Sequence, residues 1–339
     1  MLEVVRPLAD HSAAAGVPTV VLYGRRPETP LDLARVFDER VRVVEVPGWG
    51  ERGLGGSALA MLRAARVVRG ELARHDGGVL HLHSSYAGFA GRLAVGGGWR
   101  IFYSPHGYSF QYESISPLAR RLARVSESML GRRGRTIAVS NAEGELAAGI
   151  VGRRRVIVVQ SGVDLPELRE VPRSSRFSVV LVGRAAVHRR PAQVGELAQR
   201  LADLDAEFTW IGDGPERAAL EAAGVDVRGW QDRDELTGAV LAADAVLHLS
   251  AYEGFPVAVL EAMAAAKPVV ASDLPPIREA LADTGILVRG VDEAEAALRR
   301  LHEDRPFGAE LGRRARARVE QAFTKKRMAE QTLSAYALD

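Results

Sequence analysis

Two glutamates stand eight positions apart in the stretch "YEGFPVAVLEAM", residues 252–263. Pro256 predicts the start of a helix, and the first amide groups of a helix lack internal partners and attract anions. Glu253 precedes this helix, and Glu261 lies about one and a half turns inside it. We therefore predict that phosphate binds at the helix start and that the two carboxylates accept hydrogen bonds from sugar hydroxyls.

The backbone that would approach the ligand belongs to Gly254, Phe255, Pro256 and Val257. Gly254 permits a close approach because it has no side chain. The structural alternative is an N-terminal charge at Glu253 and an ion pair along the helix at Glu261. No basic residue lies within four positions of Glu261, which disfavours that alternative.

Three arginines follow another apolar run, in "GRAAVHRRP" at residues 183–191. Gly183 lets the backbone leave a strand tightly, and Arg184, Arg189 and Arg190 place guanidinium groups near the strand end. Guanidinium groups match phosphate oxygens in a bidentate manner. The segment therefore predicts a phosphate-binding loop, with a solvated basic loop as the alternative.

Two further strand ends carry weaker signals. Gly212 opens "GDGPERAALE", where a turn from strand to helix explains the residues by itself. The loop "GWQDRDEL", residues 229–236, offers Trp230 or Gln231 as a contact for a nucleobase. Ordinary packing of the Trp230 side chain is the interpretation that we favour for that residue.

These segments require strands to position them, and short β-branched runs alternate with helical stretches along the chain. The first series of predicted strands is Thr19–Tyr23, Val41–Val46, Val79–His83, Arg100–Ser104, Thr136–Val139 and Arg155–Val159. The second is Ser178–Val182, Glu207–Ile211, Asp226–Arg228, Ala245–Leu249, Pro268–Ala271 and Ile286–Val288. The alternation predicts an α/β protein with parallel sheets covered by helices.

A polar segment with two prolines at residues 164–176 separates the two series. We therefore expect two Rossmann-like, doubly wound domains rather than one eight-stranded barrel. Open sheets of this kind bind ligands at the carboxyl ends of their strands, where the strand order reverses. The segments quoted above follow predicted strands and meet that expectation.

Composition narrows the class of protein. The 339 residues are 47% apolar and 26% charged, as in ordinary soluble domains. The chain has no cysteine, which excludes thiol nucleophiles and thiolate metal sites. Arginine supplies most of the basic residues and keeps its proton, so the pI of 9.0 does not predict nucleic-acid binding. No run long enough to span a membrane and no secretory start is visible, so we expect a cytoplasmic protein.

Several segments of the chain resemble a known protein family. The segment from Glu253 to Glu261 is similar to the glutamate–seven residues–glutamate motif of retaining GT-B glycosyltransferases of the family 4 type. The segments "AMAAAKPVVASDLPPIREAL", "IGDGPERAALE", "HLHSSYAGFAGRLA" and "YSPHGYSF" also resemble that family, as does Gly183-Arg184. The resemblance runs from near residue 2 to the end of the chain.

The resemblance implies a GT-B architecture with the sugar nucleotide bound mainly to the second domain. Residues 1–165 would form the acceptor-side domain, residues 166–320 the nucleotide-sugar domain, and residues 321–339 a helix that returns to the first domain. It implies transfer with retention of configuration, no metal requirement and no cofactor, since the nucleoside-diphosphate sugar is a substrate. The other partner would be a carbohydrate or other hydroxyl acceptor, and no oligomeric state is predicted.

Residue roles also follow from the resemblance. Glu261 would bind the ribose and Glu253 the donor hexose, while Arg184 and Arg189 hold the diphosphate. The family usually has lysine where Arg189 stands, so Arg190 is an alternative at that position. His106 matches the family's histidine that faces the donor sugar, and His83, Ser84 and Ser85 would line the acceptor side. The leaving phosphate would take the acceptor proton in a front-face reaction.

The chain departs from the family pattern at its start. Members normally open with a strand and a glycine-rich loop, whereas residues 2–14 read directly as the helix that follows them, ended by Gly16. We expect the upstream reading frame to encode that strand and loop. A cut chain or a true loss are the alternatives, and in-frame stop codons just before Met1 would contradict the expectation.

A basic helix is predicted near residues 117–130. Its apolar stripe is Leu118, Leu122, Val125 and Met129, and the nearby arginines are Arg120, Arg121, Arg124, Arg132, Arg133 and Arg135. Such a face suits docking on an anionic membrane at its inner surface. A solvated basic face on a packed helix is the commoner alternative.

The sequence thus predicts a hexose-type transfer from a nucleoside-diphosphate sugar to a glycan, a lipid-linked sugar or a small molecule. The surface-polysaccharide members of the family are the ones that "HSSYAGFAGR" and "PHGYSF" resemble most. Two rivals remain: a sugar-nucleotide isomerase of the 2-epimerase type, and a catalytically inactive binding protein.

Overall fold

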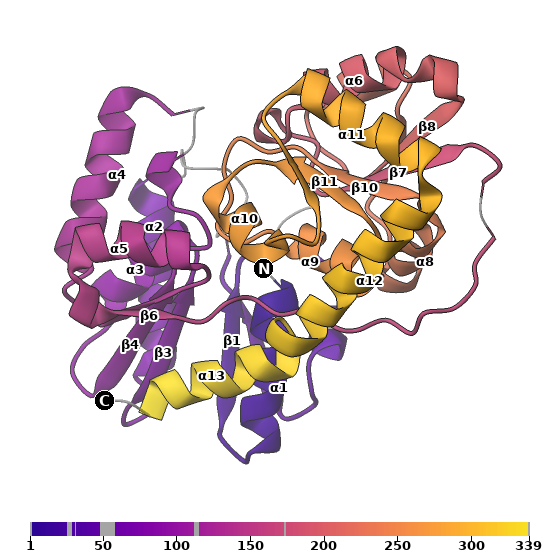
Figure 1. Ribbon diagram of the computed structural model, residues 1–339. Coiled ribbons are helices and arrows are strands. Elements are labelled where there is room, and N and C mark those ends of the chain that lie inside the picture. The colour runs from indigo at the N-terminus through magenta and orange to yellow at the C-terminus, as the bar shows by residue number, and fades with distance from the viewer. Residues whose placement is uncertain are drawn as a thin grey trace. The chain divides into compact units, whose positions relative to one another are not determined.

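The computed structural model describes residues 2–25, 29–30, 32–47, 58–111, 115–172 and 174–337, with the side chains of 58–62 excepted. Met1, residue 173 and residues 338–339, which belong to predicted segments, lie outside the described residues. The chain divides into two compact units (Figure 1). Unit 1 comprises Met1–Ser161 with Lys325–Asp339, and unit 2 comprises Gly162–Thr324.

Unit 2 is built on a six-stranded parallel sheet in the order β12-β11-β10-β7-β8-β9. Its strands are β7 (Phe177–Val182), β8 (Ala206–Ile211), β9 (Asp226–Gly229), β10 (Ala245–His248), β11 (Val269–Ser272) and β12 (Ile286–Val288). From β7 the chain first builds outward through β8 to β9, then returns to place β10 on the other side of β7. The order therefore reverses between β7 and β10, which is where doubly wound sheets bind ligands.

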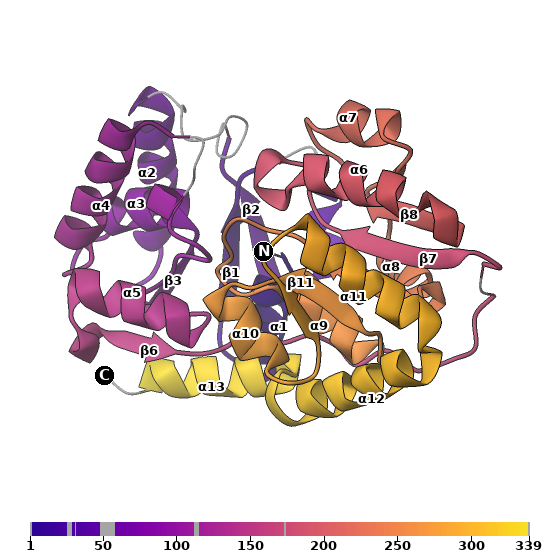
Figure 2. The same cartoon turned by 45° about the horizontal axis from the view of Figure 1, so that its top comes forward.

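Helices cover this sheet in unit 2 (Figure 2). They are α6 (Pro191–Arg200), α7 (Arg217–Ala222), α8 (Arg233–Ala242), α9 (Val257–Ala264), α10 (Pro275–Leu281), α11 (Val291–Glu303) and α12 (Arg305–Ala322), with short 3₁₀ turns η4 (Val187–Arg189) and η5 (Ala202–Leu204). Strand residues such as Val179 and Leu247 are buried with Leu197 of α6 and Leu298 of α11 in one large core. Burial on both faces explains why these strands read as continuous apolar runs.

Unit 1 contains two parallel sheets. One has the order β3-β4-β5-β6, and the other pairs β1 with β2. The strands are β1 (Thr19–Tyr23), β2 (Val41–Glu45), β3 (Gly78–His83), β4 (Trp99–Ser104), β5 (Arg135–Ala138) and β6 (Val156–Val158). Within the described ranges no hydrogen-bonded strand joins the two sheets.

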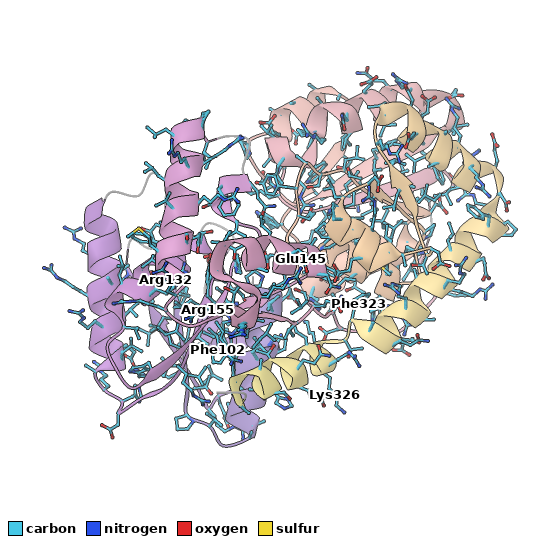
Figure 3. The ribbon with its side chains drawn as sticks, turned by 60° about the vertical axis from the view of Figure 1, so that its left-hand side comes forward. Phe102, Arg132, Glu145, Arg155, Phe323 and Lys326 are labelled. Atoms are coloured by element: carbon cyan, nitrogen blue, oxygen red, sulfur yellow. The ribbon has the colours of Figure 1, made fainter. Side chains whose placement is uncertain are left out.

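The helices of unit 1 include one from the far end of the chain. They are α1 (Leu2–Ala14), α2 (Ala58–Leu72), α3 (Ser85–Ala94), α4 (Pro117–Leu130), α5 (Asn141–Val151) and α13 (Lys325–Ala337), with 3₁₀ turns η1 (Leu33–Val36), η2 (Ser109–Gln111) and η3 (Arg153–Arg155). On α13, Tyr336 packs its ring 4.9 Å from that of Phe102 in β4, which Figure 3 labels on the sheet. Lys325 of α13 reaches Glu3 of α1 at 2.6 Å. The chain terminus thus completes the core of unit 1.

The α/β class with parallel sheets is confirmed, and all twelve predicted strands are present with ends within one residue of their predicted positions. The barrel alternative is excluded by the open strand orders. Helix ends shift slightly more, because α9 begins at Val257 rather than Pro256 and α7 begins at Arg217 rather than Pro215. Prolines sit in the turns just before these helices.

Candidate functional site

The loops after β7 and β10 meet at the point where the strand order of unit 2 reverses. The amide of Ala251, after β10, donates to the carbonyl of His188 in η4 at 2.8 Å. The His188 ring stacks on Tyr252 with centroids 5.2 Å apart. Gly183, with φ +136°, allows β7 to turn sharply, and a Cβ at that position would touch the Arg189 guanidinium. The Arg189 side chain therefore lies next to the end of β7, where the strand order reverses.

Arg189, Glu253 and His248 form a compact charged cluster there. Arg189 Nη1 donates to Glu253 Oε1 at 2.6 Å, and His248 Nε2 lies 2.8 Å from the same oxygen. The side chain of Glu253 is only 10% exposed and that of Arg189 is 18% exposed. Arg189 Nε is buried and has no hydrogen-bond partner within the described residues. We call these three residues the donor-side cluster.

The electrostatics of the donor-side cluster fix its protonation. Burial by itself raises the pKa of Glu253, but the Arg189 charge and the hydrogen bond from His248 outweigh it and bring that pKa to about 2. Burial, assisted by Arg189, lowers the pKa of His248 despite its contact with Glu253. At neutral pH the cluster is therefore a carboxylate, a guanidinium and a neutral imidazole. Glu253 has no proton to give, so it can orient a ligand but cannot act as a general acid.

The start of α9 differs in detail from the sequence-based picture. The Val257 amide already donates to the Phe255 carbonyl at 3.0 Å, so it is not a free anion donor as we had expected. Phe255 is buried at 7% exposure and packs its ring 5.5 Å from that of Phe323. Gly254 and Pro256 are also buried. Phe255 thus anchors the turn while the chain before it carries Glu253.

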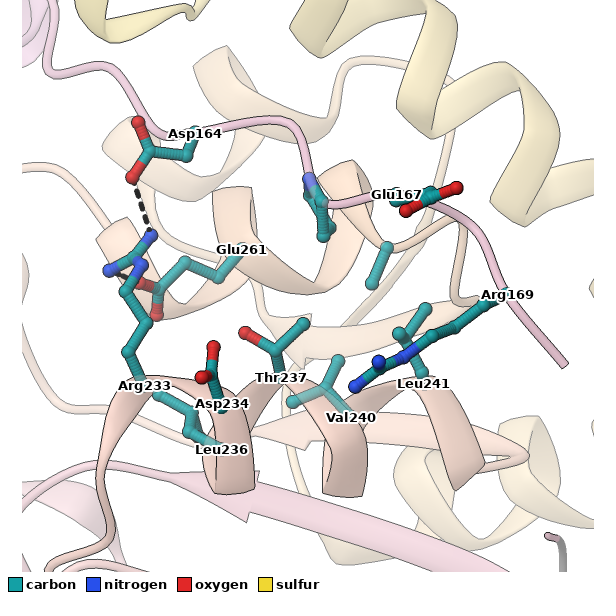
Figure 4. Close-up of a pocket in the computed structure, with 12 residues that line it drawn as sticks. Asp164, Glu167, Arg169, Arg233, Asp234, Leu236, Thr237, Val240, Leu241 and Glu261 are labelled. Atoms are coloured by element: carbon teal, nitrogen blue, oxygen red, sulfur yellow. Dashed lines mark ion pairs between the residues drawn. The ribbon is translucent and has the colours of Figure 1, made fainter. Parts of the chain in front are cut away.

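Glu261 lines a cavity of about 350 Å³ between α8, α9 and the segment after Gly162. Arg233 of α8 approaches Glu261 Oε1 at 3.6 Å and Asp164 at 3.0 Å, as Figure 4 shows. The helix-face ion pair that the local sequence disfavours is therefore replaced by a tertiary one, because Arg233 comes from another helix. Thr237 and Leu241 supply part of the remaining wall.

The other predicted residues of unit 2 surround these groups. Arg184 is exposed just after β7, while Arg190 adopts a left-handed conformation with φ +54° directly before α6. Gly212 has φ +135°, and a Cβ there would collide with the carbonyl of Gly183. The ends of β7 and β8 can therefore approach only because Gly212 lacks a side chain.

Trp230 is not packed in the core, contrary to the interpretation that we favoured, because 52% of its surface is exposed. Its indole follows the edge strand β9, whose outer side carries no further strand among the described residues. The neighbouring Gln231 has a buried Oε1 atom with no hydrogen-bond partner in the described part of the chain. An exposed ring beside an unsatisfied acceptor is an arrangement that can receive a planar ligand.

In unit 1, three histidines meet at the carboxyl ends of β3 and β4. His83 Nδ1 lies 2.9 Å from His106 Nε2, and the His81 and His83 rings are 4.0 Å apart. His81 contacts the Tyr336 hydroxyl at 2.6 Å and the Ser104 hydroxyl at 2.9 Å. We call His81, His83 and His106 the histidine cluster, and His106 holds an uncommon left-handed conformation with φ +55°.

Burial keeps the histidine cluster neutral. It lowers the pKa of His83 to about 3 and, with the neighbouring histidines, holds the pKa values of His81 and His106 well below their usual range. Glu143 of α5 supports the cluster, since its Oε1 accepts the Gly107 amide at 2.6 Å. Burial raises the pKa of Glu143 to about 7, against the opposing effect of the amides that it accepts.

The two predicted serines have structural contacts. Ser84, with φ +79°, immediately precedes α3, and its amide donates to the Ser104 carbonyl at 2.9 Å. The Ser85 hydroxyl accepts from the Ser109 amide at 3.3 Å. Both residues are only partly buried. They belong to the same sheet end as His83 and His106.

Sequence reasoning missed several charged or polar residues of these sites, among them His81 of the histidine cluster. His248 is a polar residue within a buried strand, and the interruption of the apolar run "AVLHL" was a signal for it. No local sequence pattern indicated Arg233, because its contact with Glu261 forms between two different helices in the folded protein. Glu143 in unit 1 was missed for the same reason, because it lies on α5 and accepts a hydrogen bond from the distant Gly107 amide.

Comparison with known proteins agrees with this architecture. A family profile described as Glycosyltransferase Family 4 matches residues 3–167, and one described as Glycosyl transferases group 1 matches residues 168–304. The chain therefore belongs to the family 4 glycosyltransferases and has the GT-B fold. It is a glycosyltransferase, and none of its described helices is long and apolar enough to cross a membrane.

Three known proteins are similar to this chain in sequence or in fold. The alpha-D-kanosaminyltransferase of Streptomyces kanamyceticus is 26% identical over 332 residues, which cover 84% of this chain and 85% of the relative. Sucrose-phosphate synthase from Thermosynechococcus elongatus superposes with a TM-score of 0.83 at 18% identity, covering 98% of this chain and 92% of that one. HepE of Anabaena in complex with UDP-glucose gives a TM-score of 0.75 at 17% identity, covering 94% and 99%.

Proposed function

We propose that the protein transfers a hexose-type sugar from a nucleoside-diphosphate sugar to a hydroxyl acceptor, with retention of anomeric configuration. The observation that carries the proposal is the donor-side cluster at the reversal point of the unit 2 sheet. It combines a fixed carboxylate, suited to sugar hydroxyls, with a guanidinium whose Nε is unsatisfied. The kanosaminyltransferase relative supports the transfer of a sugar, and the UDP-glucose complex of HepE supports a sugar nucleotide as donor.

Each group then has a defined role. Arg189, with Arg184 or Arg190, would stabilise the charge that develops on the departing diphosphate. Glu253 would accept hydrogen bonds from the donor hexose, and Glu261 those of the ribose. Trp230 and Gln231 would contact the nucleobase. Gly183 and Gly212 would let the diphosphate approach the backbone.

Residues of unit 1 complete the assignment. His106 would hydrogen-bond the donor sugar as a neutral imidazole, since its pKa is held well below the usual range by burial and by His83. His83, Ser84 and Ser85 would contact the acceptor. The phosphate leaving group would take the acceptor proton, because Glu253, with a pKa of about 2, is too weak a base to remove it efficiently. We propose no metal or cofactor in this step.

The defining assay is incubation of the protein with UDP-, GDP-, ADP- and dTDP-sugars, preceded by a thermal-shift screen to select the donor. Acceptor-dependent release of nucleoside diphosphate supports the proposal, provided that NMR of the product shows the anomeric configuration of the donor sugar to be retained. An altered sugar nucleotide without acceptor indicates an isomerase instead. Binding with no turnover of any donor indicates an inactive binding protein.

The ribose role is tested separately with Glu261→Ala. Loss of charge-assisted hydrogen bonds worth about 1.5–3 kcal/mol weakens nucleoside-diphosphate binding about tenfold to a hundredfold. Glu320→Ala is the matched control, because Glu320 is an exposed glutamate of unit 2 that pairs with Arg316 on α12. Unchanged affinity in Glu261→Ala, measured by calorimetric titration, refutes the ribose assignment.

A further inference from the structure

Helix α4 of unit 1 turns an apolar surface towards solvent. Its exposed residues are Leu118 at 67%, Leu122 at 61%, Val125 at 48% and Met129 at 70%. At 3.6 residues per turn these four side chains fall within an arc of about 60° and extend along about 17 Å of the helix. We call them the apolar stripe. A stripe of this kind normally faces the protein core, so its exposure needs an explanation.

The opposite side of α4 holds the helix in this orientation. Glu127, about half a turn away from the stripe, is buried at 6% exposure and is the only acidic residue of the helix. Its carboxylate accepts from Arg92 Nη2 of α3 at 2.7 Å and from the Tyr103 hydroxyl of β4 at 2.9 Å. The Arg92 guanidinium also lies 4.2 Å from the Tyr103 ring centre. Rotating α4 to hide the stripe would break this buried ion pair, which is costly.

The exposed surface of α4 carries positive charge and no negative charge. Arg121 and Arg124 are exposed on one side of the apolar stripe, about 70° and 130° round the helix from its centre, and Arg132 is exposed just beyond the helix end, where Figure 3 labels it. The backbone of Arg132 is held by Arg155, which donates to its carbonyl at 3.2 Å. The accessible part of α4 is thus an apolar strip with arginines on one side and beyond its end. Figures 1 and 2 show α4 on the outside of unit 1, beside α3 and α5.

We propose that α4 is a docking surface for an anionic lipid bilayer. The apolar stripe would enter the boundary between head groups and acyl chains, parallel to the membrane plane, and the arginines would meet lipid phosphates. Charge complementarity favours this occupant over a second copy of the chain, because two such faces would bring their arginines together. The inference does not depend on the chemistry proposed for unit 2.

The test is flotation of the full chain with vesicles of phosphatidylcholine alone and of phosphatidylcholine mixed with phosphatidylglycerol. We expect binding to the mixed vesicles that weakens as salt is raised. Leu122→Glu combined with Met129→Glu should lower the partition coefficient at least about tenfold, since two apolar side chains no longer insert. Val17→Glu is the matched control, because Val17 is a 55% exposed apolar residue elsewhere in unit 1.

The electrostatic part is tested with Arg121→Ala and Arg124→Ala, each expected to reduce binding about fivefold. Lys326→Ala on α13 removes the same charge from another surface and should have no effect. All substituted side chains are exposed, so circular dichroism and the melting temperature should match the wild type. Absence of binding at low salt, or equal binding by the glutamate pair, overturns the proposal. Self-association abolished by Leu122→Glu, without vesicle binding, overturns it in favour of a dimer.

Discussion

Replacing Arg189 by alanine tests whether the donor-side cluster is held together by charge. The pKa of Glu253 lies near 2, against 4.5 for the free side chain, so at neutral pH its folded environment favours the ionised form by about 3 kcal/mol. Removing the guanidinium forfeits most of this energy, in the range of about 3–5 kcal/mol seen when a buried ion pair loses one partner. For a unit of this size the melting temperature should fall by about 6–20 °C.

The destabilisation caused by Arg189→Ala should change with pH in a defined direction. In the wild type the pKa of His248 is lowered by burial and by Arg189, so below pH about 6.5 the unfolded chain binds more protons there and stability falls with acidification. In Arg189→Ala, His248 can take up that proton beside Glu253. The destabilisation of the variant should therefore shrink between pH 8 and pH 5, while Glu253 itself stays ionised in the wild type.

Scanning calorimetry at both pH values measures the effect. Arg228→Ala is the control, since its pair with Asp226 is largely exposed and worth less than about 1 kcal/mol. The double variant Arg189→Met, Glu253→Gln should recover part of the stability, because no charge remains buried there without a partner. A loss below about 1 kcal/mol in Arg189→Ala, or one that grows on acidification, refutes the reasoning.

Three further predictions follow from packing and burial. Glu127→Ala leaves the buried Arg92 guanidinium without its carboxylate partner, so the free energy of unfolding of unit 1 should fall by about 3–5 kcal/mol; an unchanged melting temperature contradicts the anchoring of α4. Gly212→Ala should destabilise unit 2 and weaken nucleoside-diphosphate binding, because the added Cβ would collide with the Gly183 carbonyl. Gly224→Ala is the control: Gly224 has φ +85° and open space around it, so this variant introduces backbone strain without a collision. Acidification from pH 7.5 to 5.5 should destabilise unit 1 in urea titrations, because the three lowered pKa values of the histidine cluster act against stability and outnumber the single raised pKa of Glu143, which lies at about 7 and acts in the opposite direction. Stability that rises on acidification contradicts this expectation.

Sequence reasoning located the strands because buried parallel strands are continuous β-branched runs bounded by turns. The positions of Gly183 and Glu253 at strand ends followed directly. The reversal of strand order between β7 and β10 did not, since local patterns carry no information about which strands are neighbours. It is that order which brings Arg189 and Glu253 together across 64 positions of the chain.

Side-chain partners were harder to predict than elements. Glu261 seemed to lack a basic neighbour only because local spacing was considered, whereas Arg233 arrives from α8 through tertiary packing. The apolar stripe of α4 was read correctly as a stripe, but its direction depends on Glu127 and Arg92, which are 35 positions apart. The exposure of Trp230 is another such case, because its strand lies at the sheet edge.

The membership of α13 in unit 1 has a consequence for the order in which the protein forms during synthesis. Met328, Ala329 and Ala335 complete a core whose other members, including Val4 and Phe102, leave the ribosome much earlier. Unit 2 is continuous in sequence and ends at Thr324, so its fold needs no residue from elsewhere in the chain. Because domains fold as units, unit 1 cannot reach its native state until α13 has been made, although most of its residues are synthesised first. Until then unit 1 lacks part of its core, so its earlier residues remain open to chaperones and proteases.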